Sequence, residues 1–201
     1  MKKRTLFLMV FVSIMTLYSC NRVLLALSGS HAPRLETDES IYKRGKELGI
    51  ESDKVLTYKD SAFLKIKRFS SNSLYIYDKE GYYLKIQETS EDPKCGGSLL
   101  KALEGLGKIT YFPRDSNKTI VNERSLWQNL ETKSDFIELG PNKHDYTVVY
   151  YWNTFISSKK NRKDIEDIKS NISKNKSVNF QLILVNQDLR RSDPTLTGIK
   201  Q

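Results

Sequence analysis

The sequence predicts one α/β domain, and three observations support this prediction. The chain has 201 residues, which is enough for a single core and too few for two large ones. Residues 147–152 form an unbroken β-branched and aromatic run, typical of a strand that is covered on both faces. A helix pattern over 158–174 and a second strand pattern over 178–185 follow, which is the order of a right-handed βαβ unit.

Upstream of this unit, the pattern predicts a hairpin and a helix. Two strands within residues 74–86 flank a four-residue loop that ends in Gly81, which tolerates the positive φ that such a loop needs. Residues 98–106 place four leucines on one helical face, and Gly107 is a suitable C-cap. We expect the hairpin to pair with strand 147–152, so that one mixed sheet spans most of the chain.

The remaining elements are predicted from local composition. Two further helices are expected at about 39–48 and 123–132, and the polar segment 115–122 is expected to be a surface loop. The helix of the βαβ unit begins after Ser157 or Ser158, either of which is a suitable N-cap. It presents a narrow apolar stripe to the core, made of Ile165, Ile168 and Ile172.

The N-terminus has the pattern of an export signal. Three basic residues at positions 2–4 precede an apolar run at 6–15, which is too short for a membrane-spanning helix of about twenty residues. It is followed by Leu17-Tyr18-Ser19-Cys20, which resembles the lipobox of bacterial lipoproteins. The resemblance implies that residues 1–19 are removed as a signal peptide and that Cys20 receives a diacylglycerol. The alternative is an ordinary cleaved signal with a chance cysteine.

The lipobox resemblance also implies a location. Two or three acyl chains, such as palmitate, hold a protein stably, so the membrane is an expected partner through the lipid anchor. Asn21 is not the aspartate that retains lipoproteins in the inner membrane of some Gram-negative bacteria. The resemblance therefore implies the outer membrane of the cell envelope, facing the periplasm. Residues 20–38, the lipidated N-terminus, are expected to form a flexible tether reaching about 25 Å, and residues 39–201 form the domain.

Charge and cysteine content exclude several classes of function. The net charge of +9 falls to +6 without the signal peptide, and basic residues alternate with acidic ones, so we expect no nucleic-acid partner. With Cys20 lipidated, Cys95 alone remains, and no internal disulfide is expected. The two histidines, His31 and His144, lie in unrelated segments, so neither a metal site nor a cofactor is expected.

The end of strand 147–152 carries a resemblance to a known family. Residues 151–160 read Tyr-Trp-Asn-Thr-Phe-Ile-Ser-Ser-Lys-Lys and resemble the active-site turn of thioredoxin-like proteins, where an aromatic-Trp-x-x-Trp run leads into C-x-x-C and Lys. Ile156 and Lys159 stand in place of the two cysteines, with Ser157-Ser158 between them. Because dithiol exchange needs two thiols, the resemblance implies a degenerate active-site turn that does not catalyse it.

The hairpin region is similar to the C-terminal half of the same family. Residues 69–81 correspond to its cis-proline loop and hairpin, with Asn72 in place of the proline, and helix 98–106 corresponds to its last helix. These pieces precede the βαβ unit, in reversed order relative to the family. The resemblance therefore implies a thioredoxin-like three-layer sandwich with a mixed sheet that is circularly permuted. The alternatives are a chance match of the hairpin and an unrelated α/β sandwich.

Two functions are compatible with these features. The first is a non-catalytic binding or scaffolding module that contacts a protein, peptide or glycan in the envelope, where tyrosines supply contact area. About half of the tyrosines in the predicted strands are expected to be core. The alternative is a one-cysteine thiol redox protein or peroxide sensor. It would use Cys95, which precedes Gly96-Gly97 and a predicted helix N-terminus, where the helix dipole stabilises a thiolate.

Overall fold

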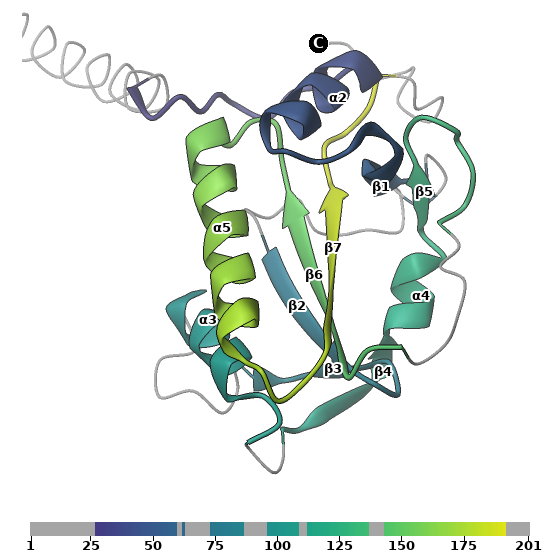
Figure 1. Cartoon of the computed structure of the whole chain (residues 1–201). Coiled ribbons are helices and arrows are strands. Elements are labelled where there is room, and N and C mark those ends of the chain that lie inside the picture. Colours follow the sequence, from purple (N-terminus) through teal and green to yellow (C-terminus); the bar gives the residue numbers. More distant parts are fainter. Residues whose placement is uncertain are drawn as a thin grey trace, which may run out of the picture.

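The chain is built around a mixed β-sheet, as a computed structural model shows (Figure 1). The structure describes residues 27–59, 62, 73–86, 96–108, 112–136 and 143–191. The seven described strands follow the order β4-β3-β2-β6-β7-β1-β5 across the sheet. Their bounds are β1 Leu56–Tyr58, β2 Ser73–Asp78, β3 Tyr82–Leu84, β4 Arg114–Thr119, β5 Trp127–Asn129, β6 Tyr146–Trp152 and β7 Phe180–Asn186.

Helices cover both faces of this sheet. The described ones are α2 (Asp38–Glu47), the 3-10 helix η1 (Ser52–Lys54), α3 (Gly96–Gly105), α4 (Ile120–Arg124) and α5 (Ser158–Lys174). Helices α3 and α5 contact each other on one face, α2 lies near the carboxyl ends of β6 and β7, and α4 lies on the opposite side (Figure 1). In the described part of the chain, none of the helices has the length and apolar character that crossing a membrane requires.

Strand β6 lies at the centre of the sheet and pairs with a different kind of neighbour on each side. It runs antiparallel to β2, where Val149 lies opposite Tyr75, and parallel to β7, where Val149 lies opposite Ile183. Helix α5 connects β6 to β7, so the predicted βαβ unit is confirmed. The pairing of β2 with β6 confirms that the hairpin belongs to the same mixed sheet.

Two apolar clusters lie on opposite faces of the sheet, and β6 contributes to both. Val148, Tyr150 and Trp152 belong to the cluster that includes residues of α2, α3 and α5, whereas Val149 and Tyr151 belong to the cluster on the side of α4. This alternation is the period of two that strand geometry imposes. The prediction that this strand is covered on both faces is confirmed.

The tyrosines of the predicted strands divide equally between the core and partly exposed positions. Three are buried, Tyr77, Tyr150 and Tyr151, and three are half-buried, Tyr75, Tyr82 and Tyr83. The expectation that about half of them are core is confirmed.

Capping interactions set the helix boundaries. The Ser157 hydroxyl accepts a hydrogen bond from the Lys160 amide at 3.2 Å, so Ser157 is the N-cap of α5, one of the two predicted candidates. Of the predicted stripe, Ile165 and Ile168 are buried, and Ile172 is partly buried against the same cluster. The predicted helices 39–48 and 98–106 are present as α2 and α3.

The β2–β3 loop requires glycine for two reasons. Gly81 has φ 86°, as the hairpin prediction expected. A Cβ atom at this position would also lie 2.8 Å from Ile120 Cγ2, which is closer than van der Waals contact. The hairpin loop therefore packs directly against the start of α4.

Two predictions downstream of α3 are wrong. The segment 115–122 is not a surface loop, because residues 114–119 form β4 and pair with β3 at the edge of the sheet. An edge strand needs backbone hydrogen bonds on one side only, and polar residues supply these as well as apolar ones. The helix expected at 123–132 is also wrong, because α4 ends at Arg124 and the fully buried Trp127 begins β5.

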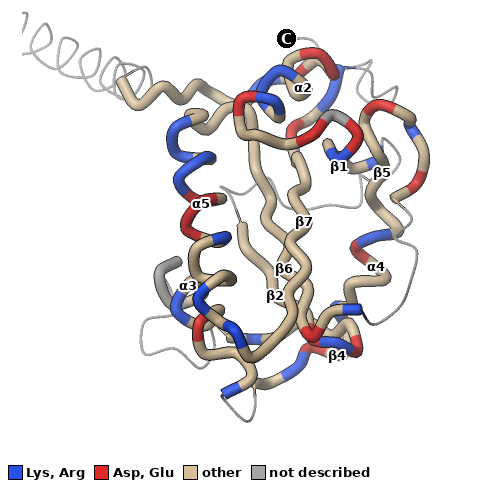
Figure 2. Tube along the Cα trace, in the orientation of Figure 1, with Lys and Arg blue, Asp and Glu red and all other residues tan. Residues whose placement is uncertain are grey.

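Charged residues of both signs are interspersed along the surface elements (Figure 2). Helices α2 and α5 and strand β4 each carry both basic and acidic residues, whereas β6 and β7 carry none. Opposite charges are therefore close enough to pair locally, as Arg114 Nε and Asp78 Oδ2 do at 2.6 Å.

Candidate functional site

Polar residues gather where the parallel strands β6 and β7 end. Because parallel strands leave a sheet at the same edge, the residues after β6 and those after β7 come together there. Five side chains at this edge are buried despite their polarity, namely Asn153, Thr154, Asn186, Gln187 and Asp188. We call this group the carboxyl-edge cluster.

Hydrogen bonds fix the carboxyl-edge cluster to the backbone. Asp188 Oδ2 accepts from the Thr154 amide at 2.7 Å and from Asn186 Nδ2 at 2.6 Å. On the helix side, the buried Asn161 side chain donates to the carbonyls of Asn153 at 2.8 Å and Ile156 at 3.2 Å. The turn between β6 and α5 is thus held from both sides.

Asp188 is an acid in an environment that favours its neutral form. Burial raises the pKa of its carboxyl group to about 6, and the negative charge of Glu36 acts in the same direction. The hydrogen bonds from Asn186 and Thr154 lower the pKa but do not offset burial. Asp188 therefore changes charge near neutral pH.

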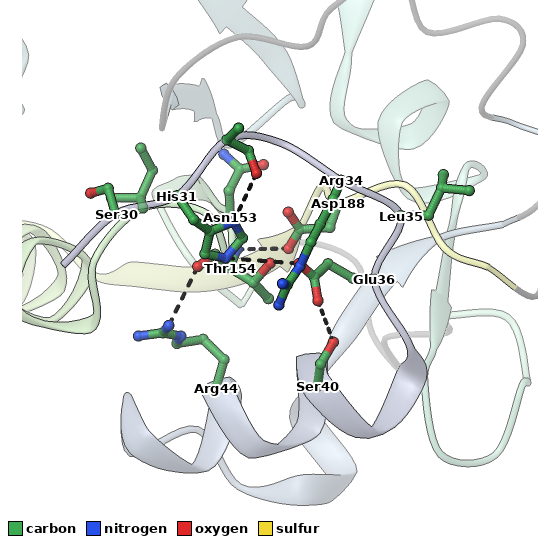
Figure 3. A network of polar contacts seen from close by, with 12 residues as sticks. Ser30, His31, Arg34, Leu35, Glu36, Ser40, Arg44, Asn153, Thr154 and Asp188 are labelled. Carbon is green, nitrogen blue, oxygen red and sulfur yellow. Dashed lines mark hydrogen bonds and ion pairs between the residues drawn. The ribbon is translucent and has the colours of Figure 1, made fainter. Parts of the chain in front are cut away.

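An N-terminal segment, residues 30–36, crosses the carboxyl-edge cluster (Figure 3). At its start, Ser30 Oγ accepts from the Ser157 amide at 3.1 Å, and the His31 amide donates to the Phe155 carbonyl at 2.9 Å. At its end, the backbone of Glu36 forms an isolated parallel β-bridge with the backbone of Arg190. The segment therefore contacts the residues that follow β6 and those that follow β7.

Residues 30–36 lie within the segment, residues 20–38, that was expected to be a flexible tether. Residues 30–36 carry little apolar pattern, so their composition resembles that of a linker. Their backbone groups nevertheless pair with those of the domain, since the Glu36 amide donates to the Leu189 carbonyl at 2.7 Å and the Arg191 amide donates to the Glu36 carbonyl at 2.9 Å. The ordered domain thus includes residues ahead of position 39.

Glu36 is the one buried side chain of the N-terminal segment. Its carboxylate accepts from Ser40 Oγ at 2.6 Å and from Arg34 Nε at 2.9 Å, and His31 Nε2 lies 3.8 Å away. Burial alone would raise the pKa of Glu36, but the hydrogen bonds from Ser40 and Arg34 and the positive charge of Arg34 bring it below its ordinary value. Glu36 is therefore ionised at neutral pH. Nearby, Arg44 Nη2 approaches the Thr154 carbonyl at 3.4 Å.

The predicted degenerate turn lies directly beneath the start of the N-terminal segment. Ser157 is buried as the N-cap of α5, Ile156 and Ser158 are half-buried, and Lys159 is exposed on the first turn of the helix. A Cβ atom on Gly29 would lie 3.4 Å from Ser157 Cβ. Gly29 and Ser30 thus cover Ser157, whereas Lys159 remains exposed.

Three predicted positions, Cys20, Asn72 and Cys95, lie outside the described residues. In the sequence, Cys95 stands directly before Gly96, the first residue of α3. Among the described residues, no group of three or more His, Cys, Asp or Glu side chains could hold a metal ion.

A separate pocket lies at the other end of β6. It has a volume of about 530 Å³ and is lined by Lys79, Glu80, Tyr82, His144 and Asp145. Charges of both signs line it, and Glu80 is already paired with Arg114 at 2.5 Å. The pocket contains none of the positions that the thioredoxin resemblance singled out.

The carboxyl-edge cluster was not predicted from the sequence. A signal was present, because Asn153-Thr154 follows one predicted strand and Asn186-Gln187-Asp188 ends the other. Polar residues at the ends of adjacent parallel strands commonly mark a site. Glu36 gave no such signal, because it lies in a segment with the composition of a linker.

Searches against protein-family models, curated proteins and solved structures find no match to this chain. The fold and the site thus define a mixed α/β domain with a polar carboxyl edge that its own N-terminal segment covers.

Proposed function

We propose that the protein is a lipid-anchored envelope lipoprotein whose domain is a non-catalytic, thioredoxin-like binding or scaffolding module. The observation that carries the proposal is the turn between β6 and α5. Ile156 and Lys159 occupy the positions of the family's two cysteines, and the Ser157 amide between them is hydrogen-bonded to Ser30. Neither residue has the sulfur chemistry that disulfide exchange requires.

The arrangement of the elements supports a permuted thioredoxin-like fold. The unit β6–α5–β7 corresponds to the half that carries the turn, and β2–β3–α3 corresponds to the half with the hairpin and last helix. The two halves share one sheet because β2 pairs with β6, and α3 contacts α5 on the same face. In the chain, the hairpin half comes first, as permutation requires.

Attachment to the outer membrane rests on the lipobox resemblance of Leu17-Tyr18-Ser19-Cys20. A diacylglycerol on Cys20 with one further acyl chain would give stable anchoring. A protein, peptide or glycan of the envelope would then be the partner of the anchored domain.

The lipid anchor is tested by replacing Cys20. In a bacterial host fed labelled palmitate, we expect the native chain to be labelled and Cys20→Ala to accumulate as an unlabelled precursor of full length. Cys95→Ala is the matched control and should be labelled like the native chain. Equal labelling of Cys20→Ala and the native chain would contradict the anchor.

The non-catalytic assignment is tested by insulin reduction. We expect the native chain with dithiothreitol to precipitate insulin no faster than dithiothreitol alone, because the turn has no cysteine. Ile156→Cys/Lys159→Cys is the informative comparison, since it restores the family's spacing and should accelerate the reaction. Turnover by the native chain that is lost in Cys95→Ser would instead favour the one-cysteine alternative.

A further inference from the structure

The N-terminal segment is attached to the domain mainly through polar contacts. Ala32, Pro33 and Arg34 are exposed, and Leu35 is half-buried. The buried member, Glu36, is an ionised carboxylate rather than an apolar side chain. Segments that bury little apolar surface open at low free energy, without unfolding of the rest of the molecule.

Beneath this weakly held segment lies the carboxyl-edge cluster, where burial disfavours the charged form of Asp188. Asp188 is almost completely buried, and Glu36 adds a second negative charge nearby. Opening would also free backbone groups on both sides of the cluster. These are the Phe155 and Leu189 carbonyls and the Ser157 and Arg191 amides.

We propose that residues 30–36 form a releasable strap, which closes the carboxyl-edge cluster at rest and opens without unfolding the sheet. The functional meaning of the strap rests on the proposed lipid anchor, because the segment would then join Cys20 to the domain. Release of seven residues adds at most about 25 Å to the reach of the tether, the value for a fully extended chain at about 3.5 Å per residue. One movement thus uncovers the polar edge and extends the domain from the membrane.

The structure offers a way to lock the strap. A Cβ atom on Gly29 would lie 3.4 Å from Ser157 Cβ, which is close to the Cβ–Cβ distance of a disulfide. The test uses the full chain in detergent with Gly29→Cys/Ser157→Cys, and with Cys20 and Cys95 replaced by serine so that the engineered pair alone can oxidise. Because this chain carries no lipid, the result does not depend on the anchor.

Hydrogen exchange then measures opening of the strap. In the reduced variant, we expect the amides of His31, Glu36 and Arg191 to exchange at least tenfold faster than the amides of β6. Oxidation should slow them at least tenfold, and dithiothreitol should restore the fast rate. Exchange at the β6 rate in the reduced state, or no change on oxidation, would overturn the proposal.

A milder variant covers the case in which the cysteine pair disturbs folding, since Gly29 has φ 69° and Ser157 caps α5. Ser30→Ala removes the acceptor of the Ser157 amide and should accelerate exchange of that amide about fivefold, with β6 unchanged. Ser116→Ala on the exposed part of β4 is the matched control and should change neither rate. An unchanged Ser157 amide in Ser30→Ala would also contradict the strap.

Discussion

Two buried carboxylates at the carboxyl edge of the sheet have opposite electrostatic environments. Glu36 is held in its charged form by Ser40 and Arg34, whereas burial dominates at Asp188 and raises the pKa of its carboxyl group. Both side chains are almost fully inaccessible to solvent, but desolvation sets the direction of the pKa shift at Asp188, whereas the hydrogen bonds and the charge of Arg34 together outweigh it at Glu36. At neutral pH, Asp188 is therefore the group whose ionisation opposes folding.

Replacing Asp188 should reveal this cost. Because its pKa is higher in the folded protein, at about 6, than the ordinary 3.8, the folded state binds the proton more tightly. The free energy of unfolding should then decrease as pH rises from about 4 to about 6. Asp188→Asn keeps an oxygen that can accept from both hydrogen-bond donors and removes the charge. We therefore expect this variant to have a free energy of unfolding about 3 kcal/mol higher than the native chain at pH 7, and almost the same at pH 4.

Urea unfolding of the native chain and Asp188→Asn at several pH values between 4 and 7 provides the measurement. Asp53→Asn, which changes an exposed carboxylate, is the control and should follow the native curve. A difference between Asp188→Asn and the native chain that does not grow with pH would show that Asp188 is not the titrating group.

At the scale of elements, predictions succeeded where apolar periodicity was strong. The central strand, helix α5 and the hairpin were recognised because their buried faces repeat with the period of a strand or a helix. Strand β4 was missed because its sequence, Arg-Asp-Ser-Asn-Lys-Thr, is polar on both faces. Its pairing depends on the β3 backbone beside it, which no local pattern reports. The short β5 was missed for a related reason, since it depends on antiparallel pairing with β1, which is far away in the sequence.

The packing of the β2–β3 loop on α4 can be tested by a double-mutant cycle. Gly81→Ala introduces a Cβ 2.8 Å from Ile120 Cγ2 at a positive φ, and we expect it to lower the free energy of unfolding by about 2–3 kcal/mol. Ile120→Ala removes the clashing atom and by itself also lowers the free energy of unfolding. In the double variant, the cost of Gly81→Ala should fall by about 1 kcal/mol, because strain in φ remains.

The cycle is measured by urea unfolding of the four proteins. Gly49→Ala is the matched control for φ alone, since Gly49 has φ 72° and a Cβ there would meet no atom within 4 Å. Strict additivity of Gly81→Ala and Ile120→Ala would show that the loop and α4 are not in energetic contact.

At the scale of the whole molecule, the sheet draws its strands from both halves of the chain. Strand β2 from the first half pairs with β6 from the second, and β1 pairs with β7. This mixing also explains why the carboxyl-edge cluster could not be predicted in full. Glu36 and Leu189 are far apart in sequence, and the fold brings them into contact.

Cutting the chain after residue 110 should therefore leave two fragments that fold only together. We expect residues 27–110 and 111–201 to be largely unfolded when separate, since each lacks half of the sheet, and to regain secondary structure when mixed in equal amounts. Circular dichroism of the separate and mixed fragments is the measurement. Cooperative thermal unfolding of either fragment by itself would indicate two independent cores instead.

The backbone β-bridge between Glu36 and Arg190 brings the beginning and the end of the described fold side by side. The two ends of the described fold therefore lie next to each other. The order of the elements along the chain then depends on which connection between neighbouring elements is left open. Followed from β6 and across this junction, the principal elements run β6, α5, β7, α2, β1, β2, β3 and α3. In that circuit the strand–helix–strand half precedes the hairpin half, and α2 becomes the connection between them. The same contacts would then be made by a chain with a different first residue.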